Sequence, residues 1–174
     1  SDPAALENLQ ILAPVINPAW GTYQLNSYLQ SWVGNNINRK GDYQEIGTQK
    51  IYKNDKVIQL QNILRESYPS KEKYPLSNGQ IGFVKSINKG HINVMYVGIP
   101  HETFGFRGDK GEDQDAAIEL AYAITIHKSQ GSDFDTVFVV LPKTGRILSR
   151  ELIYTALTRA KKRVVLLVQD SIGW

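Results

Sequence analysis

The sequence predicts an α/β fold in which a parallel sheet with flanking helices is interrupted by a small antiparallel barrel. Three observations support this prediction. Short apolar runs alternate with helical patterns near both ends of the chain. In the middle, short strand patterns are joined by tight turns, as in small barrels. The α/β signals then resume, so the order along the chain implies one parallel sheet with an insertion.

The first part of the chain predicts a strand, a loop and a helix. Residues 10–15 form an apolar run that contains Pro14, as expected of a buried parallel strand that enters a loop. After Gly21, apolar residues recur at helical spacing: Tyr23, Leu25, Tyr28, Leu29 and Trp32. We expect Trp32 to pack in the core. For Trp20 and Trp174, core packing and base stacking remain equally open.

The middle of the chain predicts strands and turns. Residues 56–61 have a strand-like pattern, and the Asn78-Gly79 turn leads into a second strand with Ile81, Phe83 and Ile87. A turn at residues 88–90 precedes a strand over residues 91–96, where apolar and polar residues alternate. Glycines interleaved with charge predict an exit linker over residues 105–116, with Gly105, Gly108 and Gly111.

The last third returns to α/β signals. Buried strands are predicted over residues 121–126 and residues 136–141, the second ended by Pro142. A helix is predicted from Ser149 to Lys162, with Ser149 as its N-cap and Glu151 in its first turn. A further strand is predicted over residues 164–168.

Composition excludes several classes of protein and site. The chain has 174 residues, of which 41% are hydrophobic and 21% charged, the balance of a soluble globular protein. It has no cysteine, which excludes disulfides and thiolate metal sites. No secretory pattern or membrane-spanning run is present, so we expect a cytoplasmic protein without a membrane partner.

The sequence predicts no metal site. The three histidines, His91, His101 and His127, lack the spacing of metal ligands. The acidic run of Glu112, Asp113 and Asp115 is interpreted as a solvated linker.

Charge is compatible with a nucleic-acid partner. The net charge is +3 and the isoelectric point is about 9.0. From residue 143 onward, basic residues outnumber acidic ones, whereas residues 109–119 are mostly acidic. This charge pattern leaves two interpretations open for the basic end, a phosphate-facing surface and a solvated basic face.

The chemistry-bearing residues fall in two stretches. Arg159 borders the apolar face of the predicted helix, where a guanidinium requires an anion. The helix alone leaves open whether that anion is a carboxylate of this chain or a phosphate. Thr125, His127 and Lys128 follow a buried strand, at the end where open α/β sheets bind ligands, and such groups contact phosphates.

These stretches resemble known helicase motifs. AITIHKSQGSDFD (residues 123–135) resembles motif V, and YTALTRAKK (residues 154–162) resembles motif VI. QILAPVINPAWGTYQLNSYLQ resembles motif IV, and DKVIQLQN followed by NGQIGFV resembles an inserted SH3-like barrel. The chain as a whole resembles the C-terminal, second RecA-like motor domain of RecD-like superfamily 1 DNA helicases, of the UvrD-like C-terminal type.

The resemblance implies a domain arrangement and site roles. Residues 1–52 and 117–174 would form the RecA-like motor domain, and residues 53–116 the SH3-like barrel and linker. Arg159 would be a catalytic arginine finger that binds nucleotide together with Gly131 and Asp133. Thr125 and His127 would contact single-stranded DNA. Motif IV departs from many relatives because no basic residue follows Pro14, so a further basic contact from that loop is not expected.

The resemblance also implies cofactors and partners. The chain contains no Gly-Lys-Ser or Gly-Lys-Thr, hence no P-loop. ATP with Mg²⁺ would be bound mainly by an N-terminal RecA-like domain of the same parent chain, and this part alone would not hydrolyse ATP. Single-stranded DNA, that domain and a larger recombination or repair complex would be the partners, with movement 5′ to 3′. The alternative is an ATPase-inactive DNA-binding or scaffold domain of a larger protein such as a relaxase.

Overall fold

The computed structural model describes residues 6–16, 20–36, 41, 43–88, 90–107, 117–143 and 148–169. The chain forms two compact units, Ser1–Val33 with Tyr122–Trp174, and Gly34–Ala121. The expected division into a motor domain (residues 1–52 and 117–174) and a barrel with its linker (residues 53–116) stays a prediction. Residues 43–52 fold back on themselves as a hairpin whose Ile51 is fully buried.

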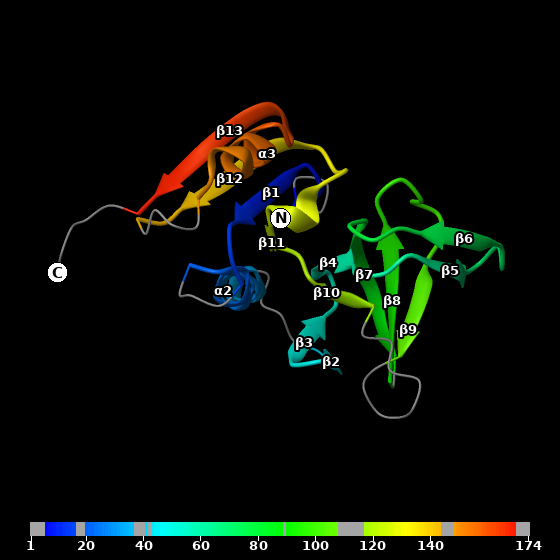
Figure 1. Ribbon diagram of the computed structural model, residues 1–174. Coiled ribbons are helices and arrows are strands. Elements are labelled where there is room, and N and C mark those ends of the chain that lie inside the picture. The colour runs from blue at the N-terminus through cyan, green and yellow to red at the C-terminus, as the bar shows by residue number, and fades with distance from the viewer. Residues whose placement is uncertain are drawn as a thin grey trace. The chain divides into compact units, whose positions relative to one another are not determined.

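The first unit is built on a parallel sheet, as predicted. Its strands are β1 (Leu9–Ala13), β11 (Ala123–Thr125), β12 (Phe134–Leu141) and β13 (Ala160–Val168). Their order is β11-β1-β12-β13, and every neighbouring pair is parallel (Figure 1). The inner strands are apolar because both of their faces are covered. Buried residues of this sheet include Leu12, Ile124, Val137 and Val139.

Helix α2 (Thr22–Asn36) forms where the helical spacing predicts it. Its buried positions include Thr22, Asn26 and Val33, which share one face. The expectation that Trp32 packs in the core is wrong, because its side chain is 57% exposed. The helix instead docks through Asn26, whose amide group hydrogen-bonds both the N–H and the C=O of Ala123, each at 2.8 Å.

Helix α3 (Arg150–Leu157) starts as predicted and ends earlier. The Ser149 hydroxyl caps it by accepting a hydrogen bond from the Leu152 N–H at 3.1 Å. The predicted extension of this helix to Lys162 is wrong, since β13 already begins at Ala160. Pairing with β12 draws residues 160–163 into the sheet, and Ala160 lies opposite Phe134.

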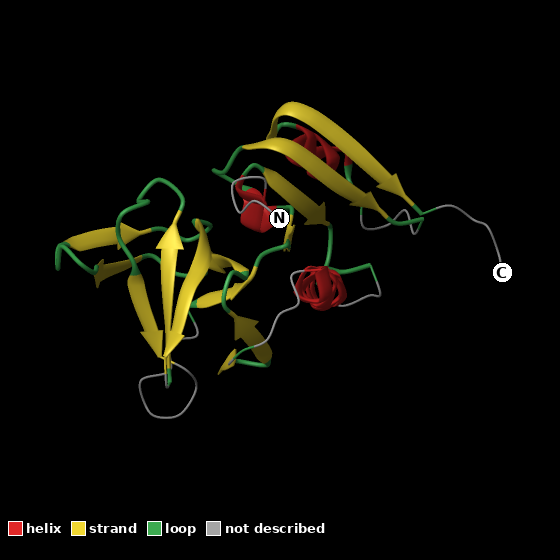
Figure 2. Ribbon diagram, turned by 180° about the vertical axis from the view of Figure 1, so that it is seen from behind, coloured by secondary structure: helices red, strands yellow, loops and turns green. Residues whose placement is uncertain are grey.

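The second unit is built from antiparallel strands. They are β2 (Tyr43–Ile46), β3 (Gln49–Tyr52), β4 (Lys56–Gln59), β5 (Ile63–Glu66), β6 (Lys73–Leu76), β7 (Ile81–Asn88), β8 (His91–Tyr96), β9 (Phe104–Arg107) and β10 (Ile118–Leu120). The main sheet has the order β10-β4-β7-β8-β9, and β2–β3 and β5–β6 form separate pairs. Figure 2 shows strands and loops, without helix, for the described residues from Tyr43 to Leu120. That this unit is an SH3-like barrel stays a prediction.

The strands predicted in the middle of the chain are confirmed. Gly79 leads into β7 with a φ of +91°, a conformation that favours glycine. The predicted exit linker is wrong over residues 105–107, which belong to β9. Gly108, Gly111, the acidic run at residues 112–115 and Trp174 lie outside the described residues. The buried side chains of this unit include Val57, Ile58, Val84, Val94, Tyr96, Phe104 and Phe106.

None of the helices within the described ranges combines the length and apolar character needed to cross a membrane.

Candidate functional site

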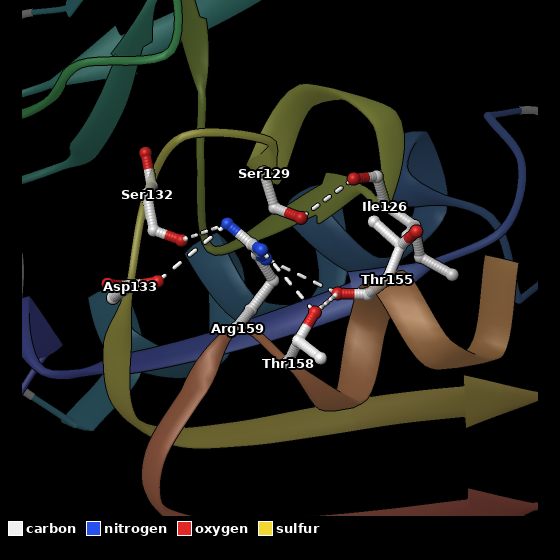
Figure 3. A network of polar contacts seen from close by, with 7 residues as sticks. All are labelled: Ile126, Ser129, Ser132, Asp133, Thr155, Thr158 and Arg159. Carbon is white, nitrogen blue, oxygen red and sulfur yellow. Dashed lines mark hydrogen bonds and ion pairs between the residues drawn. The ribbon is translucent and has the colours of Figure 1, made fainter. Parts of the chain in front are cut away.

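Arg159 lies directly before β13, and its side chain turns toward the loop that leads into β12 (Figure 3). Its Nη1 donates to the Ser132 carbonyl at 3.4 Å and lies 3.7 Å from Oδ1 of Asp133. Its Nε donates to the Thr155 carbonyl at 3.3 Å, and its Nη2 to the Thr158 hydroxyl at 3.4 Å. Backbone pairing fixes the two segments, since the Phe134 N–H donates to the Arg159 carbonyl at 2.8 Å.

These contacts hold the guanidinium loosely. Each of its hydrogen bonds is longer than the usual 2.7–3.2 Å of an N–H···O bond. The ion pair with Asp133 is wide, and the two side chains are 22% and 53% exposed, so solvent screens it. A phosphate that approached from solvent could therefore replace neutral acceptors with charge-assisted hydrogen bonds. The arrangement fits a phosphate-binding arginine.

Gly131 shapes the loop beside Arg159. Its φ is +85°, a conformation that side-chain-bearing residues rarely adopt. A Cβ at this position would meet no atom within 4 Å, so the requirement for glycine comes from the backbone conformation and not from crowding. The turn brings Ser132 and Asp133 to the guanidinium.

A second group of residues follows the end of β11. Thr125 is the last residue of that strand and is buried, and its hydroxyl accepts a hydrogen bond from the Lys128 N–H at 3.3 Å. His127 opens the short 3₁₀ helix η1 (His127–Ser129), and its side chain is exposed. Ser129 is fully buried and donates to the Ile126 carbonyl at 2.7 Å. Of the two predicted DNA contacts, His127 is the accessible one.

The two groups lie at opposite ends of the parallel strands. Thr125 pairs with Ala13 at the end of β1, whereas Thr136 of β12 pairs with Leu9 at its start. Asp133 and Arg159 precede β12 and β13, and in a parallel sheet all strands start at the same end. The structure therefore brings Gly131, Asp133 and Arg159 together and does not bring Thr125 and His127 to them. Spacing within one motif could not reveal this separation.

Sequence reasoning missed some neighbours of Arg159. Thr155 lies four residues before Arg159, and this helical spacing could have identified it. Ser132 contributes a backbone carbonyl, for which the residue type gives no signal. Lys162 and Asp135 form a second ion pair nearby in the sheet, with Nζ and Oδ2 2.8 Å apart.

Electrostatics at the start of α3 follow from its cap. The pKa of Glu151 is lowered because its carboxylate accepts hydrogen bonds, first from its own backbone N–H and then from the Ser149 side chain, which outweigh burial. Within the described ranges, no three His, Asp or Glu side chains come together as a metal ion would need.

Known proteins that are similar to this chain include helicases. Residues 120–167 match the model of the UvrD-like helicase C-terminal domain. The chain is 30% identical over 156 residues to the ATP-dependent RecD2 DNA helicase of Deinococcus radiodurans, covering 89% of this chain and 19% of that protein. It is also 30% identical over 179 residues to an uncharacterized protein of Methanocaldococcus jannaschii, covering 95% of this chain and 15% of that protein.

Among solved structures, the fold is similar to the Pif1 helicase from Bacteroides in complex with ADP-AlF3 and single-stranded DNA. The TM-score is 0.55 with 18% sequence identity, over 92% of this chain and 42% of that one. At this identity the likeness concerns the fold. The chain thus spans less than half of each of these relatives.

Proposed function

We propose that the chain is the second motor half of an ATP-dependent DNA helicase, from the match of residues 120–167 to the UvrD-like helicase C-terminal domain and the similarity to the RecD2 DNA helicase. In this proposal, ATP with Mg²⁺ binds between the first unit and a P-loop domain elsewhere in the parent chain. The first unit is the RecA-like motor domain, and the second is the inserted SH3-like barrel.

The observation that carries the proposal is the loosely held, partly exposed guanidinium of Arg159 beside Asp133 and Gly131. Phosphoryl transfer is catalysed mainly by positioning and by stabilising charge on the transferred group. An arginine presented across a domain boundary stabilises that charge without breaking strong contacts of its own. Arg159 would act on the γ-phosphate, and Asp133 would contact the rest of the nucleotide.

The other end of the sheet, where β11 ends, supports a separate DNA-contacting role. His127 is exposed there, two residues after the buried Thr125. The segment from Thr125 to Asp133 connects the two ends of the sheet. A displacement of the residues proposed to bind nucleotide would therefore be passed along this segment to the residues proposed to bind DNA. In this proposal, ATP binding shifts the DNA contacts, which is the basis of translocation.

One observation favours the alternative of an inactive DNA-binding or scaffold domain. Arg159 already has an intramolecular carboxylate neighbour, Asp133, with the two atoms 3.7 Å apart. In a scaffold domain this pair would be the arginine's whole role. The two functions differ in whether Arg159 affects ATP hydrolysis.

Because the proposed nucleotide and DNA contacts lie at opposite ends of the strands, separate variants can test them. In a parent protein with both motor domains, we expect His127→Ala to raise the DNA concentration for half-maximal ATPase stimulation and to leave kcat at saturating DNA nearly unchanged. Asp133→Asn should instead raise the KM for ATP without changing the DNA requirement. Lys162→Ala, which removes the neighbouring exposed ion pair, is the matched control. Equal behaviour of all three variants would contradict the proposal.

A further inference from the structure

The hairpin of β2 and β3 has one buried and one exposed face. Ile46 and Ile51 are buried, at 4% and 0% exposure. Because side chains alternate along a strand, Tyr43 and Glu45 of β2 share the other face with the residues paired to them across the hairpin. The outer face is therefore not needed for the core.

Two tyrosines and a lysine form a cluster on this outer face. Tyr43 and Tyr52 are directly paired across the strands, with ring centroids 5.6 Å apart and ring planes tilted by 50°. Nζ of Lys50 lies 4.6 Å from the centre of the Tyr43 ring. We call Tyr43, Lys50 and Tyr52 the tyrosine platform.

The hairpin holds this platform in place. Gly47, the first residue of the two-residue turn, has a φ of +57°, as tight hairpin turns require. The Tyr52 N–H donates to Oδ2 of Asp55 at 2.8 Å, which fixes the end of β3. The Gln49 side chain accepts from the Leu120 N–H at 2.9 Å and ties the hairpin to β10. The rings are presented on a braced scaffold.

Exposure and charge favour one ligand. The side chain of Tyr43 is 44% exposed, which is a large aromatic surface left in water. Lys50 at the ring and the exposed Lys53 beside Tyr52 supply positive charge. Glu45, opposite Lys50, is the acidic group on the same face. Aromatic rings flanked by lysines match the alternation of bases and phosphates in single-stranded nucleic acid.

We infer that the tyrosine platform is a binding site for single-stranded DNA, in which Lys50 moves from the Tyr43 ring to an adjoining phosphate and a base stacks on the ring in its place. The inference rests on the proposed function only in taking DNA as the ligand. It adds a contact through bases in the second unit to the backbone contacts proposed for His127. Stacking tolerates any base, so the site would carry no sequence preference.

The experiment compares two probes on the 174-residue chain by fluorescence anisotropy. One is a labelled oligothymidylate, and the other is an abasic oligonucleotide of equal length, which keeps the phosphates and lacks the bases. We expect Tyr43→Ala to weaken binding of oligothymidylate roughly tenfold and to leave binding of the abasic strand unchanged. Tyr43→Phe should bind both strands like the native chain. Tyr28→Ala, at an exposed tyrosine of the uncharged helix α2, is the control and should change neither affinity.

Charge variants complete the test. Lys50→Gln should weaken both probes and lower the salt dependence of binding by about one ion, whereas Glu45→Gln should strengthen both. Oligothymidylate affinity unchanged by Tyr43→Ala would overturn the inference and point to a protein as the occupant of this face. His127→Ala separates the two proposals, because a backbone contact would be lost on both probes. The inference and the proposed function can therefore fail independently.

Discussion

At the scale of single residues, the hydrogen bonds of Arg159 are ones that its guanidinium could give up for a phosphate. It donates to the carbonyls of Ser132 and Thr155, which carry no net charge. A guanidinium that is half committed to neutral acceptors can respond to a phosphate at small cost.

Glu151 gives a prediction about pH. Its pKa is lowered in the folded protein by hydrogen bonds from its own N–H and from Ser149. A carboxyl with a depressed folded pKa contributes stability above its unfolded pKa and loses it as pH falls through the folded value. We therefore expect Glu151→Gln to be less stable than the native chain near neutral pH.

The expected difference should shrink as the pH is lowered toward about 3, because the carboxyl then loses its charge progressively. Urea unfolding at the two pH values measures it. A difference that persisted unchanged in acid would show that the carboxylate charge is not responsible. Glu7→Gln, outside α3, serves as a control.

At the scale of elements, α2 supplies two hydrogen-bond partners of the β11 backbone, which also pairs with β1. Asn26 hydrogen-bonds both the N–H and the C=O of Ala123 in β11, which is an edge strand of the sheet. Asn26→Ala would leave two buried backbone groups without these partners. Each such group costs about 1–3 kcal/mol, so we expect the free energy of unfolding to fall by about 2–6 kcal/mol. Gln24→Ala, at an exposed position of α2, should change it by less than about 0.5 kcal/mol. Chemical denaturation of the three chains compares them, and equal stability of the two variants would contradict this role.

Sequence patterns predicted the elements better than their ends. The apolar runs gave β1 and β12, and the Ser149 cap gave the start of α3, because these signals are local. The end of α3 depends on pairing with β12, which no local pattern contains. Trp32 fits a helical apolar pattern, yet α2 docks through Asn26, because the backbone of a distant strand needs its amide.

The site could be predicted in part. Arg159 stands out in the sequence from its place beside an apolar face, whereas the assignment of Gly131 and Asp133 to the site follows from the resemblance to motif V. The position of Gly131, Asp133 and Arg159 at one end of the strands, away from His127, follows from the strand register, which motif spacing does not encode. The tyrosine platform has no motif, since it arises from cross-strand pairing of Tyr43 with Tyr52.

At the scale of the whole molecule, the net charge of +3 leads to a prediction about salt. Contacts to phosphates release counterions, so the affinity of the chain for single-stranded DNA should fall linearly with salt on logarithmic axes. Anisotropy titrations over a range of salt concentrations measure the slope. We expect weak binding with a steep slope, and an affinity that stayed flat between low and high salt would exclude phosphate contacts as its source.

The central claim is that Arg159 acts on ATP held by another domain of the parent protein. DNA-stimulated ATP turnover should be measured for the native parent and for Arg159→Ala at saturating ATP and single-stranded DNA. We expect turnover to fall by on the order of 10³ or more, with ATP still bound and stability changed by less than about 1 kcal/mol, because the ion pair with Asp133 is wide and solvated. Turnover within a few fold of native, or none in either protein, would contradict the motor assignment and favour the scaffold.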